Sequence, residues 1–188
     1  MQTLRTFIAV DIAPSVVARV AQLIAEMQST TASVKWVSDK NLHLTLQFLG
    51  DVEALHIPPV CEAVQSAVKD SEPFELAYAG VGAFPDLRRP RTLWVGVEHG
   101  AEAICELQRR IETALVPLGF RPEGRRFHPH LTIGRVKHGS ADELARKLQD
   151  HASFQGGASY ISEVVVYSSE LSREGPTYTA LSRAVLGG

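Results

Sequence analysis

The tripeptide His-Leu-Thr occurs twice in the chain, at 43–45 in NLHLTLQFLG and at 130–132 in RRFHPHLTIGR. Both copies stand in apolar runs that are typical of β-strands. Residues i and i+2 of a strand project from the same face, so each copy presents one imidazole and one hydroxyl on one face and its leucine on the other. A single copy would most simply be a surface pair, whereas two matching copies on matching strands indicate one shared site.

Two imidazoles and two hydroxyls that face one groove are suited to acid–base chemistry on a phosphodiester. The reference pKa of histidine is near 6.5, so one ring can accept a proton while the other donates one. Threonine hydroxyls can donate hydrogen bonds to the non-bridging phosphate oxygens, where negative charge must be held. We therefore predict in-line cleavage, with water activated on one side and an alkoxide protonated on the other, and no need for a metal ion or another cofactor.

The composition is that of an ordinary folded domain. The 188 residues are 45% hydrophobic and 21% charged, and the formal net charge of −2 excludes a polyelectrolyte binder of long nucleic acid. No apolar run approaches the roughly 18 residues of a membrane-spanning helix, and we expect no signal peptide. The only cysteines, Cys61 and Cys105, lack CxxC spacing, so we expect reduced thiols in a cytoplasmic protein without zinc or redox chemistry.

The spacing of apolar residues predicts a mixture of strands and helices. Strands are predicted over 4–13, 33–37, 42–50, 74–85, 92–98 and 128–137, followed by two C-terminal strands on either side of the turn SREGPT at 172–177. Helices are predicted over 15–30, 57–70, 101–119 and 140–151, the last with Ser140 as its N-cap. Each half of the chain places its His-Leu-Thr strand after its first helix, which indicates a weak internal duplication centred near residue 90.

Beyond the two tripeptides, a series of longer segments resembles one family. These are TFIAVDI, VKWVSDKNLHLTLQFLG, GAFPDLRRPRTLWVGV, RRFHPHLTIGR and SELSREGPTYTAL. They resemble the RNA 2′,3′-cyclic phosphodiesterases, historically called 2′-5′ RNA ligases, of the 2H phosphoesterase superfamily. The resemblance runs from about residue 4 to 186. It implies an α+β fold in which residues 1–188 form a single bilobal, duplicated domain, with two antiparallel sheets flanking a central groove and helices outside.

The resemblance also implies an activity and a substrate. A monomeric, metal-independent hydrolase would act on RNA 3′ ends or nucleotides that carry a 2′,3′-cyclic phosphate and would release a 2′-phosphomonoester. Reverse ligation through a 2′-5′ linkage is microscopically allowed at the same site. His43 would be the general acid that protonates the departing ribose 3′ oxygen, His130 the general base that activates water, and Thr45 and Thr132 the phosphate ligands.

Arg135 matches the family arginine that follows the second motif and is a candidate for binding phosphate, since a guanidinium matches phosphate oxygens. It lies five residues after His130, so strict alternation would turn it away from that ring. A bulge at Gly134 or the end of the strand is needed to turn it inward.

The sequence predicts less specific roles for several other residues near the motifs. His128 shares the face of His130 by parity, but its position at the start of the strand, before Pro129, leaves its role open. Phe48 is expected to point into the core, while Phe7 is a candidate for stacking on a terminal base. Two arginine-rich loops are expected either to be solvated or to contact the RNA backbone, with the arginines at positions 88, 89 and 91 and at positions 121, 125 and 126.

Two other functions remain open. A metal-dependent phosphoesterase could use the histidines as ligands, although neither motif strand has a carboxylate on its histidine face. A non-catalytic module of the same fold could bind RNA ends or nucleotides. Retention of activity in EDTA would argue against the first function, and conversion of a cyclic phosphate would argue against the second.

Overall fold

The computed structural model describes residues 2–173 and 175–188. The strands are β1 (Thr3–Val10), β2 (Ser33–Trp36), β3 (Leu44–Glu53), β4 (Phe74–Phe84), β5 (Thr92–His99), β6 (His130–His138), β7 (Gln155–Ile161), β8 (Glu163–Ser172) and β9 (Gly175–Val185). The helices are α1 (Pro14–Met27), α2 (Ile57–Val68), α3 (Ala101–Leu115) and α4 (Ala141–Asp150). No helix among the described residues is long and apolar enough to cross a membrane.

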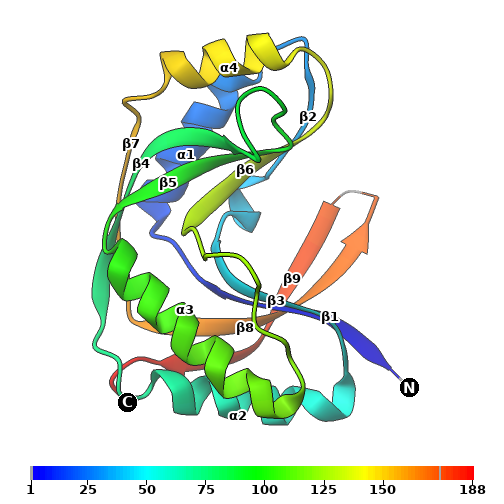
Figure 1. Cartoon of the computed structure of the whole chain (residues 1–188), viewed down its shortest axis with the longest axis vertical. Coiled ribbons are helices and arrows are strands. Elements are labelled where there is room, and N and C mark those ends of the chain that lie inside the picture. Colours follow the sequence, from blue (N-terminus) through cyan, green and yellow to red (C-terminus); the bar gives the residue numbers. More distant parts are fainter. Residues whose placement is uncertain (1, 174) are drawn as a thin grey trace.

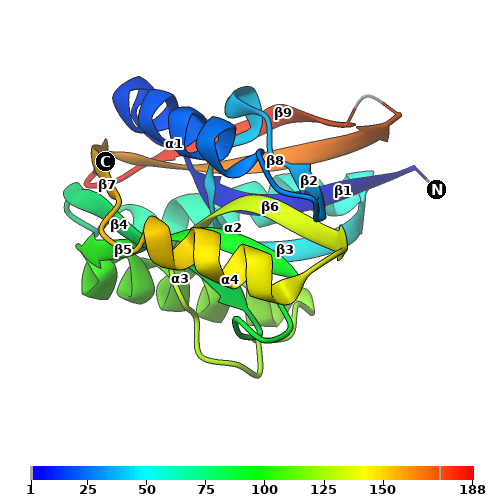
Figure 2. The same cartoon turned by 90° about the horizontal axis from the view of Figure 1, so that it is seen from above.

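The strands form two sheets in which all pairs are antiparallel. The β3 sheet has the order β3-β1-β8-β9, and the β6 sheet has the order β2-β6-β5-β4-β7. Helices α2 and α3 pack against each other and against the β3 sheet, while α1 packs against β7 of the β6 sheet. Figures 1 and 2 show the helices on the outer sides of the two sheets. The predicted α+β class, with two antiparallel sheets and helices outside, is confirmed.

Helices form where the sequence carries an apolar stripe or a cap. In α1, one stripe is fully or nearly fully buried, formed by Val16, Val20, Leu23, Ile24 and Met27. In α4, the hydroxyl of Ser140 accepts a hydrogen bond from the backbone N–H of Glu143 at 3.3 Å, which confirms the predicted N-cap. Polar contacts join α4 to the end of α1, including one of 3.1 Å between His151 and Glu26.

Each sheet takes strands from both halves of the chain. The first half supplies β1, α1, β3 and α2 in that order, and the second supplies β5, α3, β6 and α4, so the two motif strands occupy matching places along the sequence. Yet β4 of the first half pairs within the β6 sheet, and β8 of the second half pairs with β1 in the β3 sheet. The two sequence halves are therefore interleaved, and neither sheet is made by one half alone.

The C-terminal region contains three strands where two were predicted. The expected strand beginning near residue 159 is divided at Ser162: β7 pairs with β4 of the β6 sheet, and β8 pairs with β1 of the β3 sheet. The chain changes sheets at a serine, without the glycine or proline that usually marks a strand end. The predicted turn SREGPT includes Glu174, which lies outside the described residues, and Gly175 already belongs to β9.

Candidate active site

Both motif strands contain a bulge at the residue that follows the threonine. Where β3 pairs with β1, Thr45 and Gln47 face consecutive residues, so Leu46 is the extra residue. Where β6 pairs with β5, Thr132 and Gly134 face consecutive residues, so Ile133 is the extra residue. In each strand the bulge puts two buried residues in succession and reverses the alternation that follows.

The reversed alternation places the fifth residue after each histidine on the histidine's own side. In β6 this residue is Arg135, which is exposed and close enough for its charge to act on His130. A bulge that turns Arg135 inward is therefore present, but it lies at Ile133, one residue before the predicted Gly134. In β3 this residue is Phe48, which is 60% exposed, with its ring 6.1 Å from that of Phe7. The prediction that Phe48 points into the core is wrong, because it assumed strict alternation through the bulge at Leu46.

The two histidines make the same hydrogen bond to the backbone. Nδ1 of His43 lies 2.8 Å from the carbonyl oxygen of Asn41, and Nδ1 of His130 lies 2.6 Å from the carbonyl oxygen of His128. A carbonyl oxygen can only accept, so each Nδ1 carries a proton and donates it. Nε2 of each ring is thereby left to take up or release the proton that titrates.

Aromatic residues of the β3 sheet surround His43. Its ring lies 4.9 Å from that of Phe7 and 5.2 Å from that of Tyr178, the latter edge-on. Tyr167 stacks on Phe7 in turn, with its ring 5.3 Å from the Phe7 ring. Phe7 is only 3% exposed and packs against the ring of His43. Little of its ring surface is therefore accessible for the predicted stacking on a terminal base.

A second aromatic group surrounds His130 on the β6 sheet. The Phe84 ring is 5.0 Å from that of His130 and 5.4 Å from that of His128. The indole of Trp94 lies 5.3 Å from Phe84 and so close to Gly82 that an added Cβ there would come within 2.3 Å of it. Glycine at position 82 therefore leaves room for the Trp94 indole, whose ring centroid lies 5.2 Å from that of His128.

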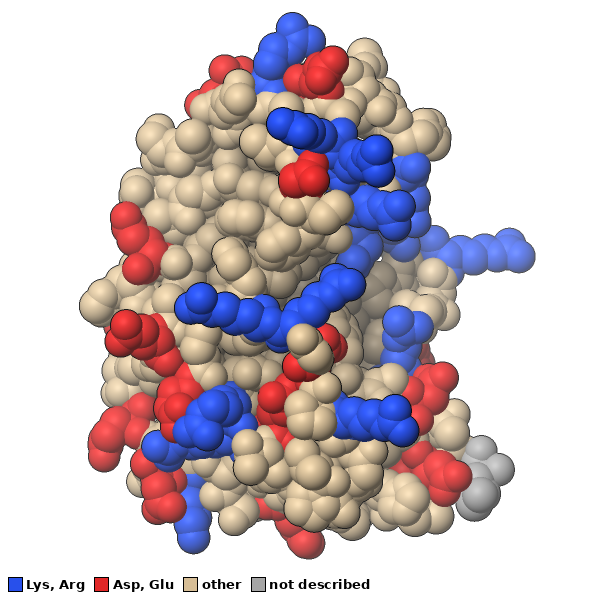
Figure 3. Space-filling view, viewed as in Figure 1, with Lys and Arg blue, Asp and Glu red and all other residues tan. Residues whose placement is uncertain are grey.

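Arg135 links the two sheets. Its charge acts on His130 in its own strand and also on Tyr178 of β9, whose ring is packed against His43. Strands β3 and β6 approach each other across the same space. Figure 3 shows the surface hollowed between the upper and lower parts of the molecule, with Lys and Arg side chains along its border. The structure thus brings the two motifs together around one groove, with the half-buried Thr45 and Thr132 beside their histidines.

The charges around the two imidazoles are opposite in sign. Burial lowers the pKa of His43 below its usual value, while the hydrogen bond to Asn41 and then the carboxylate of Asp11 raise it. Burial also lowers the pKa of His130, its hydrogen bond to the carbonyl of His128 raises it, and the charges of His128 and Arg135 lower it further. The pKa of both rings is therefore lowered by burial, and the nearby charges differ only in direction: Asp11 favours the protonated form of His43, while Arg135 favours the neutral form of His130.

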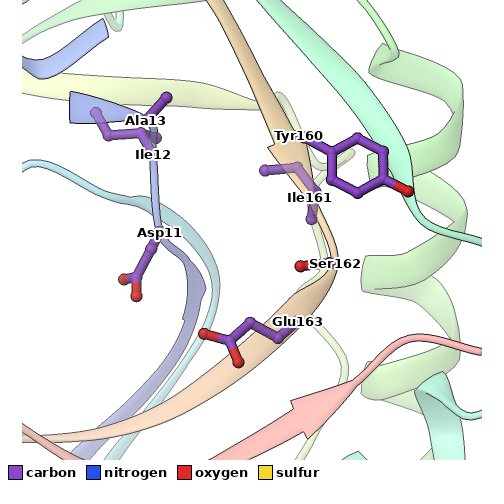
Figure 4. A pocket seen from close by; sticks show the side chains of 7 residues that line it. All are labelled: Asp11, Ile12, Ala13, Tyr160, Ile161, Ser162 and Glu163. Atoms are coloured by element: carbon purple, nitrogen blue, oxygen red, sulfur yellow. The ribbon is translucent and has the colours of Figure 1, made fainter. Parts of the chain in front are cut away.

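Asp11 belongs to an ionic cluster at the place where the chain passes between the sheets. Its carboxylate accepts a hydrogen bond of 2.6 Å from the hydroxyl of Tyr167, and Arg183 bridges it to Glu163. Figure 4 shows Asp11 and Glu163 pointing into the same space, a cavity of about 180 Å³ that Tyr160 also lines. Sequence reasoning missed this cluster, because its members are distant in the chain and form no motif.

Other candidates lie outside the groove or have no ligand arrangement. Cys61 and Cys105 are free thiols on α2 and α3. Among the residues that the structure describes, no group of three or more His, Cys, Asp or Glu side chains could hold a metal ion. The arginines of the two basic loops are exposed.

The fold and the site define a class of two-sheet α+β proteins in which twin His-x-Thr strands meet at one groove. The chain belongs to the 2′-5′ RNA ligase superfamily, whose family model matches residues 7–171. An RNA 2′,3′-cyclic phosphodiesterase of Methanothermobacter thermautotrophicus is 39% identical over 176 residues, covering 93% of this chain and 95% of the relative. The enzyme of the same name from Aquifex aeolicus is 33% identical over the full length of both chains.

Solved structures share the fold. The protein TT0787 of Thermus thermophilus superposes with a TM-score of 0.83 at 25% identity, covering 98% of both chains. Escherichia coli LigT in complex with 3′-AMP superposes with a TM-score of 0.80 at 23% identity over the full length of both chains.

Proposed function

We propose that the protein hydrolyses the terminal 2′,3′-cyclic phosphate of RNA or of nucleotides to a 2′-phosphomonoester. The observation that carries this proposal is the matched pair of imidazoles, each with Nδ1 bound to a backbone carbonyl and Nε2 left for proton transfer. The names of the relatives support the same substrate, and the 3′-AMP bound to LigT supports a nucleotide ligand for this fold. We also propose that the protein is cytoplasmic, as expected from its two cysteines without CxxC spacing.

The reaction is an in-line displacement at phosphorus. His130, in its neutral form, takes a proton from water as the water oxygen bonds to phosphorus. The bond between phosphorus and the ribose O3′ breaks, and protonated His43 donates its proton to that oxygen. The products are a 2′-phosphomonoester and a 3′-hydroxyl, and the rings are restored when His130 releases a proton to solvent and His43 takes one up. The reverse sequence, with a 5′-hydroxyl in place of water, would make a 2′-5′ linkage.

The charge distribution supports this division of roles. The acid must carry a proton when the substrate binds, and Asp11 favours the protonated form of His43. The base must be neutral, and burial together with the charge of Arg135 favours the neutral form of His130. Exchanging the two roles would oppose both effects.

The other site residues would hold the phosphate. Thr45 and Thr132 lie two residues after their histidines, on the same side of the sheet, where their hydroxyls can donate to non-bridging oxygens. Arg135, turned inward by the bulge at Ile133, would add a guanidinium to the same anion. No step requires a metal ion.

The test uses a short RNA that ends in a 2′,3′-cyclic phosphate. We expect conversion to the 2′-phosphate, identified against 2′- and 3′-phosphate standards, and full activity in EDTA. His43→Ala and His130→Ala should each lower kcat/KM by about 10²- to 10⁴-fold, the usual contribution of one acid–base group. Thr45→Ser and Thr132→Ser, which keep the hydroxyl, serve as matched controls and should retain most activity.

Three outcomes would contradict the proposal. A 3′-phosphate product would mean that the other ester oxygen leaves. Tight binding of the cyclic-phosphate RNA without conversion would indicate a binding module. Loss of activity in EDTA that zinc restores would indicate a metal-dependent phosphoesterase.

A further inference from the structure

The residue two positions before each catalytic histidine differs between the two motifs. Both residues accept a hydrogen bond from Nδ1 of the following histidine through their backbone carbonyl. Before His43 this residue is Asn41, whose side-chain amide donates to the carbonyl oxygen of Pro176 at 3.0 Å. Before His130 it is His128, an exposed imidazole. The backbone interaction is therefore duplicated, while a third imidazole is present on one side only.

The ring of His128 lies within the aromatic group that contains His130. Its centroid is 6.2 Å from that of His130, 5.2 Å from that of Trp94 and 5.4 Å from that of Phe84. Proline at position 129 restricts the backbone before it to extended conformations, which helps to fix the ring in this place. His128 thus faces the same groove as His130, although it lies outside β6.

Several neighbouring elements place side chains near His130. Strands β4 and β5 contribute Phe84, beside His130, and Trp94, beside His128, neither of which carries a charge, and β2 places the charged Lys35 opposite Arg135. The strand of His130 itself contributes Arg135, and the preceding loop contributes His128. The β3 sheet reaches this region through Tyr178, which is electrostatically linked to Arg135. Within the part of the chain that the structure describes, His128 is therefore the one imidazole among the charged neighbours that act on His130, and imidazole is the type of side chain that can serve as a switch near physiological pH.

We propose that His128 is a positioning residue that sets the pH at which His130 takes up its proton. The proposal rests on the role of His130 as general base in the proposed function. At acidic pH a charged His128 opposes a second charge on its neighbour and keeps His130 available as a base.

The test compares wild type with His128→Asn, which copies the residue found before His43. NMR titration of the ring signals should show that the pKa of His130 rises by about 0.5 unit, as expected for two charges about 6 Å apart in water. The acidic limb of kcat/KM should move to higher pH by a similar amount, because a base of higher pKa becomes protonated earlier. His128→Lys, which keeps a charge at all pH values, should not raise the pKa of His130.

The controls separate this inference from the proposed function. His151→Asn, just after α4 and bound to Glu26, should leave both measurements unchanged. An unchanged titration of His130 in His128→Asn would overturn the inference, even if cyclic phosphate is hydrolysed. A uniform loss of activity without a shift of the limb would also overturn it. A shifted titration in a protein that hydrolyses no cyclic phosphate would support the coupling and contradict the proposed function.

Discussion

At the level of single residues, the two imidazoles share one geometry and differ in the charges around them. Each is held by a carbonyl oxygen two residues earlier and by aromatic rings of its own sheet. The carboxylate of Asp11 acts on His43, whereas the guanidinium of Arg135 and the imidazole of His128 act on His130. The twin motifs are therefore chemically distinct because of residues outside the motifs.

The role of Asp11 can be tested through the alkaline limb of the pH profile. Burial lowers the pKa of both histidines, so kcat/KM should be bell-shaped with its centre below about pH 6.5. Asp11→Asn removes a carboxylate that favours protonated His43, so the pKa of His43 should fall further. The alkaline limb, which reports loss of the acid's proton, should then move to lower pH by a few tenths of a unit, on the order expected for a screened charge.

Glu163→Gln is the matched control for this measurement. It removes a carboxylate from the same ionic cluster, since Arg183 bridges Glu163 and Asp11. If both variants move the alkaline limb equally, the effect comes from the cluster as a whole and Asp11 has no special influence on His43.

At the level of secondary structure, the bulges complete the site. Leu46 and Ile133 each follow a motif threonine, and each reverses the alternation of the strand behind it. Gly134 follows the bulge in β6 and is crowded by β2: an added Cβ would come within 2.8 Å of Val34 and 3.0 Å of the Trp36 ring. The position of Arg135 therefore depends on a glycine that lets β2 pack closely.

Gly134→Ala should disturb this packing. Overpacking of this kind typically costs about 1–3 kcal/mol, and the displaced strand should also move Arg135 and raise KM. Thermal unfolding and steady-state kinetics measure the two effects. Gly124→Ala is the control, since no atom lies within 4 Å of its added Cβ. Equal stability of the two variants would contradict the prediction, because it would show that β2 can shift without lowering the free energy of unfolding.

The sequence predicted correctly which residues of the motif strands face the core, because apolar and polar residues alternate regularly in each strand up to its threonine. Leu44 and Leu131, expected in the core, are fully buried. The period alone could not place Phe48, since nothing in LQFLG marks Leu46 as an extra residue. The break at Ser162 and the influence of Asp11 were also out of reach, because both depend on contacts between segments that are distant in the chain.

At the level of the whole molecule, an arginine-rich loop borders the His130 side of the groove. The loop of residues 85–91 leaves β4 directly after Phe84, which contacts both His128 and His130. It enters β5 at Thr92, which is paired with Arg135. Asp86 holds this loop by accepting bonds from the backbone N–H groups of Arg88 and Arg89. The exposed arginines of this loop are thus held at the border of the groove.

Replacing Arg88, Arg89 and Arg91 together by Gln should weaken the use of an RNA oligonucleotide and spare a cyclic mononucleotide. The logarithm of kcat/KM for the oligonucleotide should depend less steeply on salt, by about 0.7 for each phosphate that these arginines neutralise. Arg109→Gln with Arg110→Gln is the control, since both guanidinium groups pair with Glu106 on α3. An equal decrease for oligonucleotide and mononucleotide would show that the loop acts on the cyclic phosphate itself.

The bulges also limit how the length of the chain can vary. Removing one residue beside Leu46 or Ile133 would restore simple alternation, and Phe48 or Arg135 would then turn toward the core while a core residue turned toward the substrate. Related sequences that keep the chemistry should therefore carry no insertion or deletion between each motif histidine and the fifth residue after it. Loops such as 85–91, which lie outside this interval, are free to lengthen or shorten.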